Sequence, residues 1–96
     1  MTIWFISRHL GAIEWVKLQN IQIDRFESHL DTSLVQAGDV VIGTLPIHLA
    51  AEVCQKGVKF YFLSINVTPE QRGTELTCKQ LTEQQCSIQP FMVEKL

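Results

Sequence analysis

The chain has 96 residues, of which 46% are hydrophobic, and its formal net charge at pH 7 is -2. This length and apolar content suit one compact domain spanning residues 1–96, and the slightly negative charge argues against a general binder of long nucleic acids. No apolar run reaches the length of a membrane-spanning helix, and the start of the chain leads directly into a strand pattern. We therefore expect a cytoplasmic protein with no membrane partner.

Short apolar runs alternate with amphipathic segments along the chain. The runs that predict strands are residues 3–6, 21–26, 40–42, 59–65 and 88–93. The segments that predict helices are residues 12–19, 46–56 and 77–85. Apolar strands separated by helices indicate a mostly parallel sheet covered on both faces. We therefore expect a single Rossmann-like, three-layer α/β domain with five strands and about three helices, in which Pro90 marks the last strand as an edge strand.

Three residues mark the ends of the first two expected helices. Pro46 is well placed near the start of the second helix, because its fixed backbone angle suits a first turn. Asn20 and Gly57 follow the two helix ends, where a left-handed backbone is favoured. Both helices are therefore expected to end at these residues.

Polar residues follow the first and third expected strands. They are Ser7, Arg8 and His9 after the first strand, and Gly43, Thr44 and Leu45 at the end of the third. In a sheet of order 2-1-3-4-5 these strands are neighbours whose connections leave toward opposite faces, and the crevice between them faces two helix N-termini. Ser64 and Asn66 would extend its rim. Free backbone N–H groups and the helix dipoles favour a phosphate at this place.

Each of these residues also has an ordinary structural explanation. Ser7 and Thr44 can simply cap the two helices, and Arg8 and His9 can be solvated loop residues. His48 lies in the first turn of the second helix, where an exposed or packing role competes with ligand binding. His29, in a polar stretch, is interpreted as a structural or surface residue.

Signals for a metal or a cofactor are absent from the sequence. The sequence has no C-x-x-C pair among its cysteines, which are Cys54, Cys78 and Cys86. They are interpreted as buried, reduced thiols. The aspartates at positions 24, 31 and 39 share no obvious site, and no glycine fingerprint for a dinucleotide or nucleoside triphosphate is present. We therefore expect no cofactor and no metal.

Three stretches together carry a family resemblance. They are T-I-W-F-I-S-R-H-L-G-A-I-E-W at residues 2–15, D-V-V-I-G-T-L-P-I-H-L-A-A-E-V-C at 39–54 and R-G-T-E-L at 72–76. The chain resembles, over nearly its whole length, a small single-domain family encoded beside type III CRISPR systems and related to the CRISPR-associated Rossmann fold domains. That family is regarded as a group of ring nucleases, which destroy cyclic oligoadenylate second messengers. The resemblance implies cyclic tetra-adenylate as the ligand and a homodimer as the binding unit.

A ring nuclease can work without a metal, by attack of a ribose 2'-hydroxyl on the neighbouring phosphate. For this reaction we expect Arg8 to stabilise the added negative charge and His9 to act as general acid or base. The residues expected to bind the ligand are Ser7, Gly43, Thr44, Leu45, Pro46, His48, Ser64, Asn66 and Arg72. A non-catalytic sponge or sensor of the same messenger is the alternative, and a flavodoxin-like binder of another nucleotide ranks below it.

Overall fold

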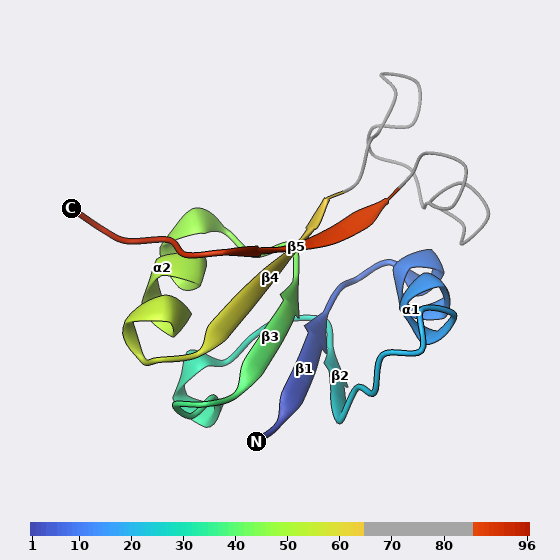
Figure 1. Cartoon of the computed structure of the whole chain (residues 1–96), viewed down its shortest axis with the longest axis horizontal. Coiled ribbons are helices and arrows are strands. Elements are labelled where there is room, and N and C mark those ends of the chain that lie inside the picture. Colours follow the sequence, from blue (N-terminus) through green and yellow to red (C-terminus); the bar gives the residue numbers. More distant parts are fainter. Residues whose placement is uncertain (65–85) are drawn as a thin grey trace.

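The computed structural model describes residues 1–64 and 86–96, which form one five-stranded sheet of order β2-β1-β3-β4-β5 (Figure 1). The strands are β1 (Ile3–Ile6), β2 (Arg25–Glu27), β3 (Val40–Gly43), β4 (Lys59–Ser64) and β5 (Ser87–Phe91). The helical elements are α1 (Leu10–Lys17), the 3-10 turn η1 (Thr32–Leu34) and α2 (Ile47–Gln55). Strands β1 to β4 are parallel and β5 is antiparallel to β4. The predicted mostly parallel α/β sheet and its strand order are confirmed, and the predicted helix at 77–85 lies outside the described residues.

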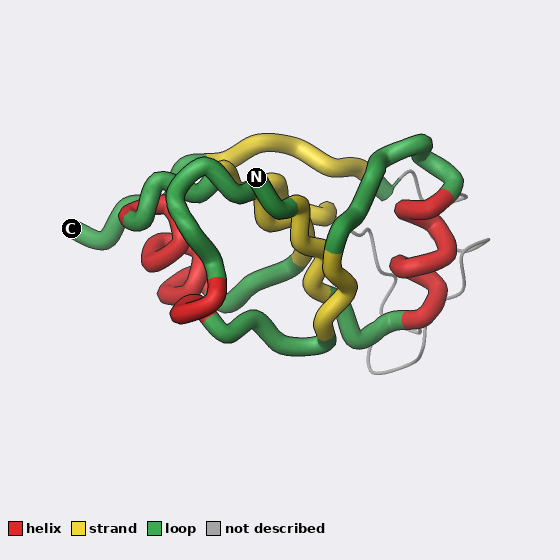
Figure 2. The backbone as a smooth tube through the Cα atoms, turned by 90° about the horizontal axis from the view of Figure 1, so that it is seen from below, coloured by secondary structure: helices red, strands yellow, loops and turns green. Residues whose placement is uncertain are grey.

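The two α-helices cover opposite faces of the sheet, as the tube view shows (Figure 2). Side chains of β1 alternate between the faces, because successive residues of a strand point to opposite sides. Trp4 and Ile6 belong to the apolar cluster beneath α2, whereas Phe5 belongs to the cluster with Trp15 and Val16 of α1. The predicted three-layer arrangement is therefore confirmed for this part of the chain.

Helix α1 begins earlier than the sequence predicted. The expected range was residues 12–19, but the N–H groups of Ala12 and Ile13 both donate to the carbonyl of His9, so that the helix starts at Leu10. It also ends earlier, because the N–H groups of Leu18 and Gln19 bond three residues back and close the last turn tightly. The helix therefore starts immediately after the polar residues at the end of β1.

Strand β2 is shorter than predicted. The apolar alternation at residues 21–26 indicated a strand, but Ile21 and Ile23 instead pack against the cluster beneath α1. Pairing with β1 starts only where the Asp24 N–H donates to the Ile3 carbonyl at 2.8 Å. Only residues from Arg25 onward form the strand, which reaches Glu27, one residue beyond the predicted end.

The predicted boundary residues behave as expected at the helix ends. Asn20 has a φ of 56° and Gly57 a φ of 85°, both in the left-handed region. Pro46 is the N-cap of α2. At the sheet edge, Pro90 lies in β5 opposite Tyr61, which confirms the predicted edge position of the last strand. Within residues 1–64 and 86–96, no helix has the length and apolar character needed to cross a membrane.

Candidate functional site

A pocket of about 680 Å³ opens at the carboxyl ends of the four parallel strands. The residues that line it follow or end these strands: 6–9 after β1, 28–30 after β2, 44–46 and Leu49 in the β3–α2 unit, and 62–64 at the end of β4. The two central connections leave the sheet toward opposite faces, since α1 and α2 pack on different clusters. The pocket therefore occupies the crevice that the strand order predicts.

Gly43 ends β3 directly before the lining residue Thr44 and lies close to β1. It is paired with Ile6, and a Cβ atom at position 43 would lie 2.3 Å from the Ile6 carbonyl oxygen. Its φ of 155° is also one that residues with a side chain rarely adopt. Glycine at this position thus allows the two strands to stay paired up to the point where their connections separate.

Ser7 orders the first wall of the crevice. Its backbone N–H donates to the Glu27 carbonyl at 3.0 Å, which joins the ends of β1 and β2. Its hydroxyl oxygen accepts a hydrogen bond from the His9 N–H at 3.1 Å. The N-cap of α1 is His9, and its side chain makes no capping hydrogen bond. Ser7 therefore shapes the turn that presents Arg8 and His9, and the helix-capping alternative is wrong for this residue.

Thr44 orders the opposite wall in a comparable way. Its hydroxyl donates to the Leu63 carbonyl at 3.1 Å and so joins the end of β3 to β4. The N-cap of α2 is Pro46, and no side chain makes a capping hydrogen bond there. The capping alternative is therefore wrong for Thr44 as well.

The lining of the crevice divides into a polar and an apolar part. Arg8 is exposed, the His9 Nδ1 atom is buried, and neither Asp nor Glu occurs among the described residues that line the pocket. Leu45, Leu49 and Phe62 supply apolar surface on the side of α2. Pro46, the N-cap of α2, and Leu49 of its first turn line the pocket, so the positive end of the helix dipole lies beside it. This combination suits a ligand with a phosphate and an apolar ring.

The structure gathers most of the predicted site residues in this pocket. Those that line it are Ser7, Arg8, His9, Thr44, Leu45, Pro46 and Ser64. Gly43 and His48 are not among the lining residues: Gly43 is buried and directly precedes Thr44, and His48 is exposed. Asn66 and Arg72 lie outside the described residues. The placement of His48 leaves it apart from the other predicted residues.

Sequence reasoning missed the contribution of the segment after β2. Ser28, His29 and Leu30 line the crevice, although His29 was interpreted only as a structural or surface residue. The available signal was positional, because the carboxyl ends of all neighbouring parallel strands meet at the same edge of the sheet. Applied to β2 as well as to β1 and β3, this rule would have included His29.

The cysteines of the described residues do not contribute to the crevice lining. Cys54 and Cys86 are free, and each is half-buried where burial was predicted; Cys78 lies outside the described residues. Burial raises the pKa of the Cys86 thiol to about 11. In residues 1–64 and 86–96 no three His, Cys, Asp or Glu side chains are grouped so that they could hold a metal ion.

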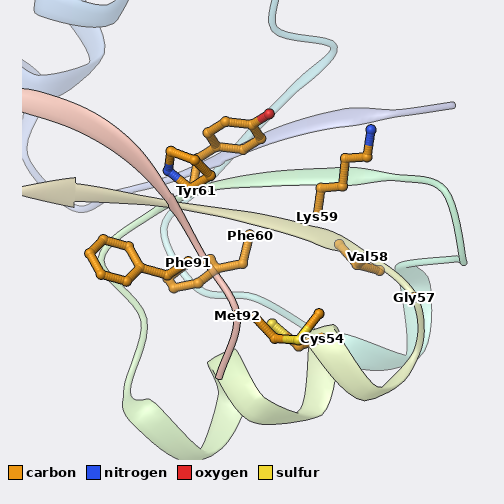
Figure 3. A pocket seen from close by; sticks show the side chains of 9 residues that line it. Cys54, Gly57, Val58, Lys59, Phe60, Tyr61, Phe91 and Met92 are labelled. Carbon is orange, nitrogen blue, oxygen red and sulfur yellow. The ribbon is translucent and has the colours of Figure 1, made fainter. Parts of the chain in front are cut away.

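A second pocket, of about 420 Å³, lies near the start of β4, between the end of α2 and the C-terminal strand (Figure 3). Cys54 and Met92 lie beside one another there, and the amino group of Lys59 points away from them. Its lining includes Phe60 and Phe91 but no histidine or arginine. It therefore lacks the imidazole and guanidinium groups that line the crevice.

Comparison with known proteins places the chain in one family. Residues 4–94 match the family model described as "Putative CRISPR-associated protein (Cas_VVA1548)". No curated protein matches the chain significantly, and neither does any solved structure. The match includes β1, β3 and the connections that form both walls of the crevice. The chain therefore belongs to the CRISPR-associated Cas_VVA1548 family.

Proposed function

We propose that this protein is a ring nuclease that cleaves cyclic oligoadenylate, with cyclic tetra-adenylate as its ligand, and so switches off type III CRISPR signalling. The observation that carries the proposal is the crevice, in which Arg8 and His9 share one pocket with the start of α2 and with no described carboxylate. Membership of a CRISPR-associated family supports the biological setting. A cyclic oligoadenylate offers both a phosphate for the polar wall and adenine rings for the apolar side.

Cleavage needs three things from the protein, and the crevice offers groups for each. The ribose 2'-hydroxyl must be held in line with the phosphate, and Ser7 and Thr44 present polar atoms on the two walls. The negative charge that grows on the phosphate must be stabilised, for which the guanidinium of Arg8 is a rigid cluster of donors. The departing 5'-oxygen must gain a proton, which an imidazole such as that of His9 can give.

The proposal includes a homodimer as the binding unit. A pocket of about 680 Å³ falls within the range of about 300–1,000 Å³ that suits one drug-sized ligand. Four linked nucleotides are considerably larger, so one crevice holds only part of the ring. A cyclic tetranucleotide can be two-fold symmetric, and two crevices across one axis would present Arg8 twice to opposite phosphates.

Incubation with cyclic tetra-adenylate in the presence of a chelator tests the proposal. We expect linear products ending in a 2',3'-cyclic phosphate, separated by chromatography and identified by mass spectrometry. If the ring stays intact and co-elutes with the protein, the chain is a sponge or sensor. If it neither binds nor cleaves the ring, the cyclic oligoadenylate proposal is wrong. Linear oligoadenylate of the same length serves as the substrate control.

The assembly is tested by light scattering without and with ligand. We expect a dimer at micromolar concentration before ligand is added, since a symmetric messenger is best bound by a preformed symmetric site. A mass of 11.0 kDa, that of one chain, in both samples would remove the shared-ring model. The cleavage assay above stays independent of this result.

A further inference from the structure

The segment after β2 brings a second imidazole into the crevice. Strands β1 and β2 are paired with Ile6 opposite Glu27, and the Ser7 N–H extends the pairing by donating to the Glu27 carbonyl. Because parallel strands keep their register, this connection carries His29 alongside the residues that follow β1. His29 and His9 accordingly line the same pocket from neighbouring strands.

Few charged groups surround this pair of imidazoles. The end of β1 contributes Arg8, and the described lining residues from β3, α2 and β4 include no titratable side chain. Two acids stand two residues from His29 along the chain: Glu27, whose carboxylate forms a 2.8 Å ion pair with Arg25, and Asp31, whose carboxylate accepts hydrogen bonds from Ser33. His29 is exposed and can exchange protons with solvent between turnovers. The two imidazoles and one guanidinium are thus the charge-bearing side chains of the described crevice.

In-line cleavage moves two protons on opposite sides of one phosphorus atom. The attacking 2'-oxygen loses a proton on one side, and the departing 5'-oxygen gains one on the other. A single side chain does not reach both oxygens at once, because they lie opposite each other across the phosphorus. A crevice with one imidazole from each of the segments after β1 and β2 can accept the proton on one side of the phosphorus and donate a proton on the other.

We propose that His29 is a second proton-transferring residue, acting together with His9; this inference rests on the proposed function. One neutral imidazole takes the proton of the 2'-hydroxyl as the bond from the 2'-oxygen to phosphorus forms. The other, protonated imidazole gives its proton to the 5'-oxygen as the bond from phosphorus to that oxygen breaks. The products are a 2',3'-cyclic phosphate and a 5'-hydroxyl, and both imidazoles regain their starting states by exchange with water.

Single-turnover cleavage of cyclic tetra-adenylate as a function of pH tests the pair. With wild type, we expect a bell-shaped profile between about pH 5 and 9, set by one imidazole that must be neutral and one that must be charged. His29→Ala and His29→Gln should each slow cleavage about a hundredfold or more and lose one limb of the profile. His9→Ala should lose the other limb. Gln55→Ala, at the exposed end of α2 outside the crevice, is the control for unchanged rate.

Three measurements separate a catalytic role from a structural one. His29→Ala should keep the wild-type melting temperature and bind the intact ring with nearly wild-type affinity, and free imidazole should restore part of its rate. If wild type cleaves while both His29 variants keep the normal rate and both limbs, the inference is wrong and the proposed function stands. A change in affinity alone, with a normal rate at saturation, overturns it equally. A wild-type protein that leaves the ring intact overturns both.

Discussion

At the amino end of the sheet, the carboxylate of Asp39 is buried and accepts three hydrogen bonds, from the Thr2 N–H, the Gln36 N–H and the Trp4 indole N–H, at 3.0, 3.0 and 3.3 Å. At the carboxyl end, by contrast, the polar side chains of Arg8 and His29 are exposed around an open pocket. The first arrangement ties three segments of chain together at one charged group. The second leaves charged and titratable groups accessible to a ligand.

This difference separates residues that hold the fold from residues available for chemistry. Burial alone favours the neutral form of Asp39, but hydrogen bonds from Gln36, Thr2 and Trp4 outweigh it and lower the pKa of the carboxyl below its ordinary value. A buried polar group with its partners in place stabilises the native structure. Substitutions at the two ends should therefore affect different measurements, cleavage at one end and unfolding at the other.

Arg8→Ala should produce the largest effect, on cleavage and ligand binding and not on stability. Because Arg8 is exposed, its loss should leave the melting temperature nearly unchanged. Loss of a charge-stabilising donor typically slows a reaction by about a hundredfold to a thousandfold, and we expect a slowing of this size with weaker ligand binding. Single-turnover cleavage and a thermal melt on the same sample check both parts. Near-normal cleavage would remove Arg8 from the mechanism, and a large drop in melting temperature would break the contrast between the two ends.

Gly43→Ala tests the point where the crevice depends on the fold. The added methyl group would meet the Ile6 carbonyl oxygen, which is backbone and cannot move aside without shifting β1 or β3. We expect a loss of about 3 kcal/mol in the free energy of unfolding, at the upper end of the usual range for overpacking. Urea unfolding measures it. Gly38→Ala is the control, because Gly38 also has a positive φ but its Cβ would meet no atom within 4 Å. An equal loss of unfolding free energy in both variants would mean that backbone strain is responsible, and not the close approach of β1 and β3.

The fold was predictable where the apolar pattern was unambiguous. It was less predictable where tertiary contacts determine whether a segment forms a strand. The short apolar runs of β1 and β3 specify buried parallel strands, and Pro90 specifies an edge. The pattern at Ile21 and Ile23 is equally strand-like, yet these side chains pack against the cluster beneath α1 from a connecting segment. An alternating apolar pattern does not show whether the buried side chains belong to a strand or to a connecting segment, since both can bury alternate side chains.

The candidate site was predictable from topology and only in part from residue type. Arg8 and Thr44 line the crevice, as expected from a strand order that sets where two connections diverge. His29 was missed because its polar neighbours suggested surface, and only the pairing of Ile6 with Glu27 brings it to the crevice. His48 was included for its position in the first turn of α2, but position in a turn does not fix the side on which a residue lies.

Asp39→Asn should weaken the amino end without affecting cleavage. The amide replaces one acceptor oxygen with a donor group opposite N–H groups, and we expect a loss of about 2 kcal/mol at pH 7, typical of a buried hydrogen bond left unmade. The folded-state pKa of Asp39 is lowered, so its stabilisation is fully present above the ordinary value of 3.8 and is lost as pH falls through the folded value. The difference between wild type and variant should therefore shrink below about pH 4.

Urea unfolding of both proteins between pH 7 and acid conditions measures this difference. Asp31, whose pKa is also lowered, by hydrogen bonds donated from Ser33 and by the charge of Lys56, is present in both proteins, so the comparison isolates Asp39. A difference that stays constant down to the lowest pH would mean that the charge of Asp39 contributes nothing. Slower cleavage by the folded variant would show that the two ends are coupled.

Substitution of Cys86 should have the smallest effect on cleavage. Cys86 lies close to the strands that line the crevice, but its side chain contributes to packing. It directly precedes β5, where Ser87 pairs with Ser64 at the end of β4, and it packs against the cluster beneath α1. Since burial raises the pKa of its thiol to about 11, very little thiolate exists at neutral pH. Cys86→Ser should leave the cleavage rate within about twofold of wild type, as for a residue that takes no part in the reaction.

Alkylation of Cys86 by iodoacetamide, followed by mass spectrometry of its peptide, should be slow at pH 7.5 in the native protein and faster in denaturant, where the ordinary pKa of 9.0 applies. Rapid alkylation of the native protein at that pH would show that Cys86 is a reactive thiol beside the crevice. The interpretation of Cys86 as a residue that contributes only to packing would then be wrong.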